Sequence, residues 1–268
     1  MAKNGINIQN SLEEEKLEVM MDRLCVIAAT LVLLLSQASR SMGAETMDNS
    51  IFAGLLKKHV TREGVNYEGL KKDEALLDNY LSMLSAIDLD SLPEKHQFAY
   101  YINVYNAFTI KLVLTRYPGI NSIKDIGGVF SSPWEKKFIP VKKGVFSLDH
   151  IEHKILRPVF KDPRVHFAIN CASKSCPLLR GEPYDGEKLD LQLDEQATEF
   201  INDGRNNFFR DGTLFLSRIF KWFEDDFSGQ PVQFVLRYAS EDLKRKINDS
   251  KDRLSVSYPD YDWALNKP

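Results

Sequence analysis

The sequence feature that most constrains the fold is a long helix predicted over His96–Tyr117. Its apolar residues recur three and four positions apart and form a stripe wide enough for burial on most sides of the helix. Pro118 and Gly119 follow directly and end it. We therefore expect this helix to lie in the core of the protein. The stripe consists of Phe98, Tyr101, Val104, Tyr105, Phe108, Leu112 and Val113.

Shorter elements are expected on both sides of this helix. Helical spacing over Ile51–His59 and Asp73–Leu84 predicts an N-terminal helical layer. The remaining signals predict a hairpin of Phe138–Val141 with Val145–Leu148, a helix that Ser147 caps and that stops before Pro158, a strand over Arg164–Asn170, a helix over Asp185–Asn202, a hairpin over Phe208–Leu216 that turns at Asp211 and Gly212, and short helices from Ile219 and Pro231.

The order of these elements predicts an α+β fold. Helices and short strands are mixed without the regular alternation of a doubly wound sheet. The chain shows no repeat and no long flexible linker after residue 50. Residues 49–268 are therefore expected to form a single compact domain, with the N-terminal helical layer and a small mixed or antiparallel sheet. The 43% hydrophobic content is ordinary for a globular core.

The N-terminal region predicts export. Leu24–Leu35 is an apolar run of 12 residues, which is short for a membrane span of roughly 20 residues and typical of a signal-peptide core. Small residues favour cleavage after Ala38, with Ala44 as the alternative site. We expect a signal peptide over residues 1–38, a flexible segment over residues 39–48, and a periplasmic or secreted protein that no longer contacts the membrane. An uncleaved anchor is the alternative.

The first residues do not fit the positive start of a signal peptide, because Glu13, Glu14 and Glu15 are acidic. Translation is expected to begin at Met20 or Met21, which makes residues 1–20 an upstream extension. The formal charge of −3 and the dispersed lysines and arginines exclude a nucleic-acid partner. No cofactor is expected. The expected partner is a small molecule, a peptide or an envelope substrate of undefined identity.

Candidate chemistry is concentrated in Asp149–Pro177, which contains three of the five histidines and both cysteines outside the predicted leader. Cys171 follows the expected strand in a polar turn, where backbone N–H groups can face a thiolate or an oxyanion. A cysteine needs a nearby imidazolium or dipole to become a thiolate at neutral pH. His153, on the preceding helix, is the candidate. Thiol and imidazole together predict a sulfur nucleophile.

The sequence does not decide which group orients His153. Glu152 is its neighbour, but adjacent side chains on a helix diverge by about 100°. Asn103 and Asn106 lie three positions apart on one face of the long helix. They either orient His153 or hydrogen-bond a neighbouring loop, which is the commoner role of a buried amide.

Two other interpretations compete with the nucleophile. Cys171 and Cys176 can form a disulfide in an oxidising compartment, with a stabilisation of roughly 2 kcal/mol for so small a loop. A metal site would use His150, His153 and His166 with the thiols. Their spacing matches neither a paired CxxC pattern nor HExxH, so no metal is expected.

Five segments in order carry a family resemblance. They are FAYYINVYNAF at Phe98–Phe108, SLDHIEHKILR at Ser147–Arg157, HFAINCASKSCP at His166–Pro177, LSRIFKWFEDDF at Leu216–Phe227 and YDWALN at Tyr261–Asn266. Over about residues 95–266 the chain resembles the bacterial and plant domain of unknown function 547. The resemblance places these residues in the site: Asn103, Tyr105, Asn106, Glu152, His153 and Cys171.

The same resemblance bears on the cysteines and the metal. Plant members often replace the second cysteine, which favours Cys171 as the working residue over an obligatory disulfide. The position of His150 varies, which weakens the metal interpretation. A distant relation to cysteine peptidases would need a rearranged chain order, because papain-like enzymes place the cysteine before the histidine and here His153 precedes Cys171.

The expected function is that of a cysteine hydrolase or acyltransferase acting on amide or ester bonds. The alternatives are a non-enzymatic envelope binding or scaffold domain with bridged cysteines, and then a metal-binding or thiol-redox protein, which the departure from CxxC disfavours. YDWALN predicts that the C-terminal tail packs onto the domain and substantially buries Trp263. The expected site residues are Cys171, His153, Glu152, Asn106 and Asn103 for catalysis, and Tyr105, Ser173, Ser175 and Arg180 for substrate binding.

Overall fold

Helix α5 (Glu94–Leu114) is the centre of the fold, as its sequence predicts. Every residue from Phe98 to Ile110 is buried, because other elements surround the helix on all sides. The computed structural model describes residues 47–128 and 131–268. The predicted signal peptide, its cleavage sites and the beginning of the predicted flexible segment lie outside the described residues.

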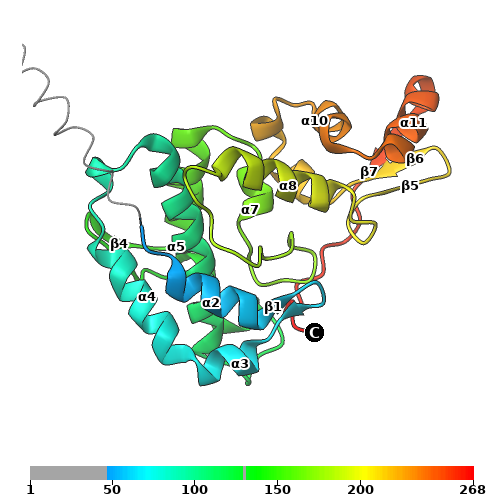
Figure 1. Cartoon of the computed structure of the whole chain (residues 1–268). Helices are drawn as coiled ribbons and strands as arrows, with labels where there is room; N and C mark the ends of the chain where they lie inside the picture. Colours follow the sequence, from blue (N-terminus) through cyan, green and yellow to red (C-terminus); the bar gives the residue numbers. More distant parts are fainter. Residues whose placement is uncertain (1–46, 129–130) are drawn as a thin grey trace, which may run out of the picture. The chain divides into compact units, whose positions relative to one another are not determined.

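The N-terminal helices form the expected helical layer. Helices α2 (Ser50–His59), α3 (Tyr67–Lys72) and α4 (Glu74–Ala86) contact one another, and both α3 and α4 pack on α5 (Figure 1). The buried faces of α2 and α4 carry leucine and aromatic residues, and Phe52 stacks on Tyr80 with ring centroids 4.8 Å apart. None of the helices in the described part of the chain is long and apolar enough to cross a membrane.

The strands form small sheets, so the predicted α+β class is confirmed. The hairpin at Asp211 and Gly212 is found as predicted, and both turn residues have positive φ, 50° and 76°. The third strand of its sheet, β7, pairs in parallel with β6. The strands are β1 (Val60–Thr61) with β2 (Gly64–Val65), β3 (Ile139–Val141) with β4 (Gly144–Phe146), and β5 (Phe208–Arg210), β6 (Thr213–Phe215) and β7 (Ser255–Ser257).

Ser147 caps the next helix, as predicted, since its Oγ accepts a hydrogen bond from the His150 N–H at 3.1 Å. The predicted stop before Pro158 is wrong. Helix α6 (Leu148–His150) continues into the π-helix η4 (Ile151–Phe160), which contains Pro158. Phe160 stacks on Phe98 of α5 with ring centroids 4.4 Å apart. We attribute the continuation to this tertiary contact, which compensates for the missing N–H of the proline.

The predicted strand over Arg164–Asn170 is also wrong, because this segment contains the short helix α7 (Val165–Ala168). Its alternating pattern does not reflect one buried and one exposed face, since all four residues of α7 are buried. The backbone of this segment forms hydrogen bonds with the side chain of Asn106 in α5, where a strand would pair with a neighbouring strand. The Asn106 amide donates to the Ala168 carbonyl at 2.9 Å and accepts from the Asn170 N–H at 2.8 Å.

The second half of the chain builds a separate apolar cluster around α8 (Leu189–Ile201), which begins four residues later than predicted. The short helices predicted from Ile219 and Pro231 are present. The remaining helices are α9 (Ile219–Trp222), η5 (Glu224–Phe227), α10 (Pro231–Tyr238), α11 (Glu241–Asp249), and the 3₁₀ turns η1 (Leu89–Ser91), η2 (Ile123–Ile126), η3 (Pro133–Glu135) and η6 (Lys251–Arg253).

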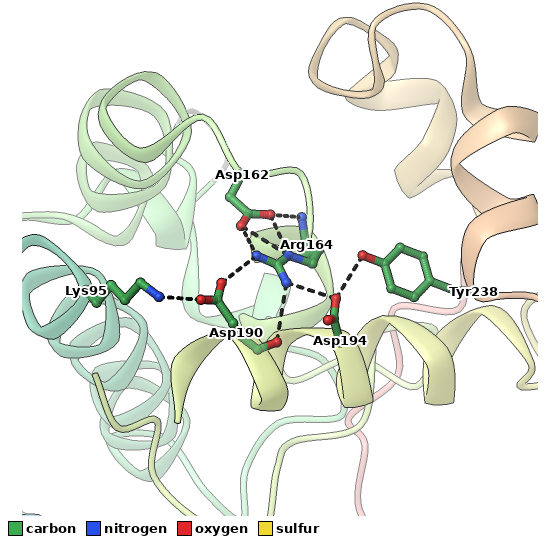
Figure 2. Close-up of polar contacts among 6 residues, drawn as sticks. All are labelled: Lys95, Asp162, Arg164, Asp190, Asp194 and Tyr238. Carbon is green, nitrogen blue, oxygen red and sulfur yellow. Dashed lines mark hydrogen bonds and ion pairs between the residues drawn. The ribbon is translucent and has the colours of Figure 1, made fainter. Parts of the chain in front are cut away.

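Helix α7 joins the two apolar clusters. Val165 and Ala168 belong to the cluster around α5, whereas Phe167 belongs to the cluster around α8. The loop before α7 is fixed by Arg164, whose guanidinium contacts three carboxylates (Figure 2). They are Asp162 at 2.6 Å, Asp190 at 3.0 Å and Asp194 at 2.8 Å; Lys95 pairs with Asp190, and the Tyr238 hydroxyl donates to Asp194 at 2.9 Å.

The C-terminal tail packs onto the domain, as its sequence predicts. Leu265 is only 1% exposed, and Trp263 is partly buried. Ala264 and Leu265 form isolated bridges with Ser122 and Ser173. The tail ends beside the β1–β2 hairpin (Figure 1), where Val65 donates its N–H to the carbonyl of Asn266. The tail is therefore positioned to contribute side chains to the region around Cys171.

Candidate functional site

A cavity of about 230 Å³ lies where the two apolar clusters meet. Helix α5, the α6–η4 helix, the segment after α7, helix α9 and the C-terminal tail all contribute side chains to its wall. It is lined by Tyr105, Ser132, Trp134, Asp149, Glu152, His153, His166, Ile169, Cys171, Cys176, Pro177, Ile219, Trp222, Phe223, Tyr261 and Trp263.

The sulfur atoms of this wall are joined in a disulfide between Cys171 and Cys176. Cys171 is partly exposed and Cys176 is 5% exposed. Hydrogen-bond donors surround the Cys176 sulfur: the Cys171 N–H at 3.0 Å, the Tyr261 hydroxyl at 3.2 Å and the Ser173 hydroxyl at 3.3 Å. Donors of this kind stabilise negative charge on sulfur.

Glu152 is a carboxylic acid of the cavity with a raised pKa. Burial raises the pKa of Glu152 to about 7, although the Tyr105 hydroxyl and the charge of Arg157 oppose the shift. The Tyr105 hydroxyl donates to Oε2 at 3.3 Å. The carboxyl group can therefore gain or lose a proton near neutral pH, which is the property required of a general acid or base.

His153 is held by two charged neighbours on its own helix. Arg157 donates from Nη1 to His153 Nδ1 at 2.8 Å, and Asp149 lies 3.4 Å from Nε2. A guanidinium has no acceptor, so Nδ1 must carry the lone pair and the proton must be on Nε2. Burial, together with the charge of Arg157, lowers the pKa of His153 despite Asp149. The imidazole is therefore neutral, and neither nitrogen is free to accept a proton from Cys171.

Asp226 connects His153 to a second histidine. Arg157 donates to Asp226 through Nε at 2.5 Å and Nη2 at 3.1 Å, and His166 Nε2 lies 2.7 Å from the same carboxylate. Burial alone would raise the pKa of Asp226, but the bonds from His166 and Arg157 hold it well below the usual range. Burial lowers the pKa of His166, and its ring stacks on Phe223 at 4.1 Å.

Aromatic side chains form the remaining wall. The chain has three tryptophans, Trp134, Trp222 and Trp263, and all of them line the cavity. Trp222 lies 5.8 Å from Trp263 and 4.9 Å from Tyr261, measured between ring centroids. Trp222 is 44% exposed, which makes it the most accessible of the three rings. Large apolar walls with few polar groups are typical of small-molecule sites.

The structure brings together five of the nine residues predicted for the site. Four of them, Cys171, His153, Glu152 and Tyr105, line the cavity, and the Ser173 hydroxyl lies 3.3 Å from each of the two sulfurs. The other four lie elsewhere. Asn103 bonds the backbone of Tyr184 twice, Asn106 bonds the chain around α7, Ser175 accepts from the Asp262 N–H, and Arg180 pairs with Glu182 and Glu195.

Sequence reasoning missed several residues that build the site. Asp149 and Arg157 lie four positions before and after His153, a spacing that could have revealed both contacts. Asp226 and Tyr261 lie within the quoted segments LSRIFKWFEDDF and YDWALN, but no local signal indicates that Asp226 approaches His166 or that Tyr261 approaches the cysteines. Their role depends on tertiary contacts between distant parts of the chain.

The described histidines are not grouped as ligands of a metal ion. Among residues 47–128 and 131–268, no group of three or more histidine, cysteine, aspartate or glutamate side chains is placed to hold an ion. His150 stacks on Phe146 at 4.3 Å, and His153 and His166 contact the Arg157–Asp226 pair described above.

Comparisons with known proteins agree with the resemblance read from the sequence. No curated protein and no solved structure matches the chain. A family model does match, over residues 89–201, which include α5, the α6–η4 helix, both cysteines and α8. The segments Leu216–Phe227 and Tyr261–Asn266, which complete the cavity, lie beyond that range. Over residues 89–201 the chain matches the family described as Protein of unknown function, DUF547.

Proposed function

We propose that the cavity performs thiol–disulfide exchange, with the Cys171–Cys176 disulfide as the reacting group. The observation that carries this proposal is the position of the disulfide in the cavity wall, with three hydrogen-bond donors around the Cys176 sulfur. The two cysteines have a sequence separation of 5. A disulfide that served only stability would therefore close a small loop and stabilise the fold by roughly 2 kcal/mol.

The Cys171 N–H distinguishes the two sulfurs, because it donates to the Cys176 sulfur at 3.0 Å, whereas the Ser173 and Tyr261 hydroxyls lie within 3.4 Å of both sulfurs. Exchange is faster when the departing sulfur has a low thiol pKa. Cys176 is therefore the leaving sulfur, and the partly exposed Cys171 is the sulfur that a substrate thiolate attacks. The Cys171–Cys176 bond breaks as the mixed disulfide with Cys171 forms, and Cys176 departs as a thiolate.

A second substrate thiolate completes the reaction. It attacks the substrate sulfur of the mixed disulfide, so that Cys171 leaves and the substrate becomes a disulfide. Two electrons pass from a substrate dithiol to the protein, which ends with two thiols. Glu152 lines the same cavity and exchanges its proton near pH 7, which suits it to accept the proton of the first attacking thiol.

The predicted export of the protein supports the same chemistry. The apolar run Leu24–Leu35 followed by small residues is typical of a signal peptide, and disulfides persist in the periplasm and outside the cell. We propose that the protein acts there, on thiols of small molecules or peptides.

The proposal predicts a disulfide that is readily reduced. Titration against dithiothreitol should give a reduction potential above about −300 mV, the range below which structural disulfides of secreted proteins fall. Tyr261→Phe removes one donor to Cys176 and should slow reduction by about tenfold, since a hydrogen bond to a charged group contributes about 1.5 kcal/mol or more. Tyr258→Phe is the matched control, because Tyr258 does not line the cavity. A potential below that limit, with equal rates in both variants, would support a structural cross-link in a binding domain.

Hydrolysis by reduced Cys171 is the second candidate, because Cys171, His153 and Glu152 line one cavity. Hydrolysis requires His153 to break its contact with Arg157 or Asp149 before the imidazole can act as a base. The test is turnover of p-nitrophenyl acetate by the reduced protein. Turnover that Cys171→Ser and His153→Ala both abolish would favour the hydrolase over the exchange reaction.

A further inference from the structure

The described wall of the cavity is acidic. Two carboxylic acids, Asp149 and Glu152, line it, and among the described lining residues there is no lysine or arginine. Arg157 lies nearby, but both of its edges are engaged, one by Asp226 and one by His153. His153 adds no charge while Arg157 donates to its Nδ1.

Glu152 retains an oxygen for a ligand. Tyr105 donates to Oε2, and among the described residues no side chain or backbone group bonds Oε1. The carboxyl group is enclosed by protein on its other sides, which explains its raised pKa. A positively charged group in the cavity would compensate for the lost hydration of this carboxylate.

The aromatic walls favour the same kind of ligand. Faces of tryptophan and tyrosine rings attract cations, and tryptophan is the strongest of them. The chain already shows this interaction on one of these rings, because the Lys124 ammonium lies 3.6 Å from the centroid of Trp263. Trp222, Tyr261 and Trp134 contribute further rings to the same wall.

We propose that the cavity binds small organic cations, and that the substrates of the exchange reaction are thiols or disulfides that carry an ammonium group close to sulfur. The substrate part of this inference rests on the proposed function, whereas the cation site follows from the cavity wall alone. Asp149 and Glu152 would bind the charge, and the rings of Trp222 and Tyr261 would enclose the alkyl groups beside it.

The charges around Glu152 set the pH dependence of binding. Tyr105 faces it from α5, Tyr261 from the C-terminal tail and Asp226 from η5, while Asp149 and Arg157 lie on its own helix. Burial holds both tyrosines neutral near pH 7 by raising their pKa values. Cation affinity should therefore follow ionisation of Glu152 and fall as pH drops below about 7.

The test uses choline and its uncharged isostere 3,3-dimethylbutan-1-ol with the oxidised protein. Because all three tryptophans line the cavity, intrinsic fluorescence reports binding directly. Choline should bind at least tenfold more tightly than the alcohol at pH 8, and about tenfold more tightly at pH 8 than at pH 6, as one ionisation near pH 7 requires.

Two variants separate the carboxyl groups. Glu152→Gln should lose the pH dependence and most of the preference for choline, while Glu135→Gln, an exposed acid beside Trp134, should bind like the wild type. Asp149→Asn changes a side chain that is 44% exposed, so it provides a second test if Glu152→Gln fails to fold. It should weaken choline binding and keep the pH dependence.

Equal affinities for choline and the alcohol, or a choline affinity that neither variant changes, would overturn the cation site. Choline contains no sulfur and dithiothreitol carries no charge, so the two proposals fail separately. Loss of choline binding with normal reduction by dithiothreitol rejects only the cation site, and choline binding with a low reduction potential rejects only the exchange reaction.

Discussion

At the scale of single residues, Glu152 and His153 show how two neighbours on one helix acquire different chemistry. Arg157 fixes the proton of His153 on Nε2 and keeps the ring neutral. Among the described residues no lysine or arginine forms an ion pair with Glu152, and burial raises its pKa from an ordinary 4.5 to about 7. The raised pKa has a consequence for stability that can be measured.

Protonation of Glu152 stabilises the folded state. The unfolded chain releases this proton near pH 4.5 and the folded protein near pH 7, so its contribution is complete below pH 4.5 and is lost as pH rises through 7. Glutamine has no proton to release, so Glu152→Gln does not lose this stability as pH rises. The variant should be more stable than the wild type at pH 8 by up to about 3 kcal/mol.

The measurement is the Tm of wild type and Glu152→Gln between pH 4 and pH 8. The two should agree near pH 4, and the variant should melt several degrees higher at pH 8. Glu135→Gln, which alters an exposed side chain, should follow the wild type throughout. A difference that is constant with pH would contradict the enclosure of Glu152.

At the scale of elements, local patterns predicted those parts whose form depends on their own sequence. The long helix has a wide apolar stripe, and the hairpin at Asp211 and Gly212 has a turn that demands positive φ. The segment around α7 was mispredicted because its backbone is bonded by Asn106, which lies 62 and 64 residues away. The continuation of η4 through Pro158 likewise depends on a contact with α5.

The residues of the candidate site likewise differ in whether local sequence predicts them. Cys171, His153 and Glu152 were predicted because their chemistry and their local spacing are visible in the sequence. Tyr261 and Asp226 were not, since Tyr261 reaches the Cys176 sulfur from the C-terminal tail and Asp226 reaches His166 from η5. A single sequence does not indicate which distant segments lie close together in the folded protein.

The C-terminal tail is the element on which the sulfur environment depends, and Leu265 anchors it with 1% exposure. Leu265→Ala should destabilise the protein by about 2–5 kcal/mol through the cavity it leaves, and lower the Tm by on the order of 5–10 °C. Leu191→Ala is the matched control, because Leu191 is 62% exposed. Equal melting temperatures of the two variants would show that the tail is not anchored there.

At the scale of the whole molecule, the cavity depends on how the two apolar clusters are joined. Helix α7 contributes side chains to both clusters, and Arg164 binds the loop before it to α8 (Figure 2). The network extends to α5 through Lys95 and to α10 through Tyr238. Because Arg164 is only 17% exposed, its ion pairs are screened less than those on the open surface.

Arg164→Met should therefore loosen the junction and destabilise the protein by about 1–3 kcal/mol, between the values for exposed and fully buried pairs. Urea unfolding is followed by tryptophan fluorescence, which reports the cavity, and by circular dichroism, which reports the helices. In the variant the fluorescence transition should precede the helical one, whereas the wild type should show coincident transitions. Arg205→Met, which removes a 59% exposed partner of Asp203, should change stability by less than about 1 kcal/mol. Coincident transitions in Arg164→Met at wild-type stability would mean that apolar packing alone holds the two clusters together.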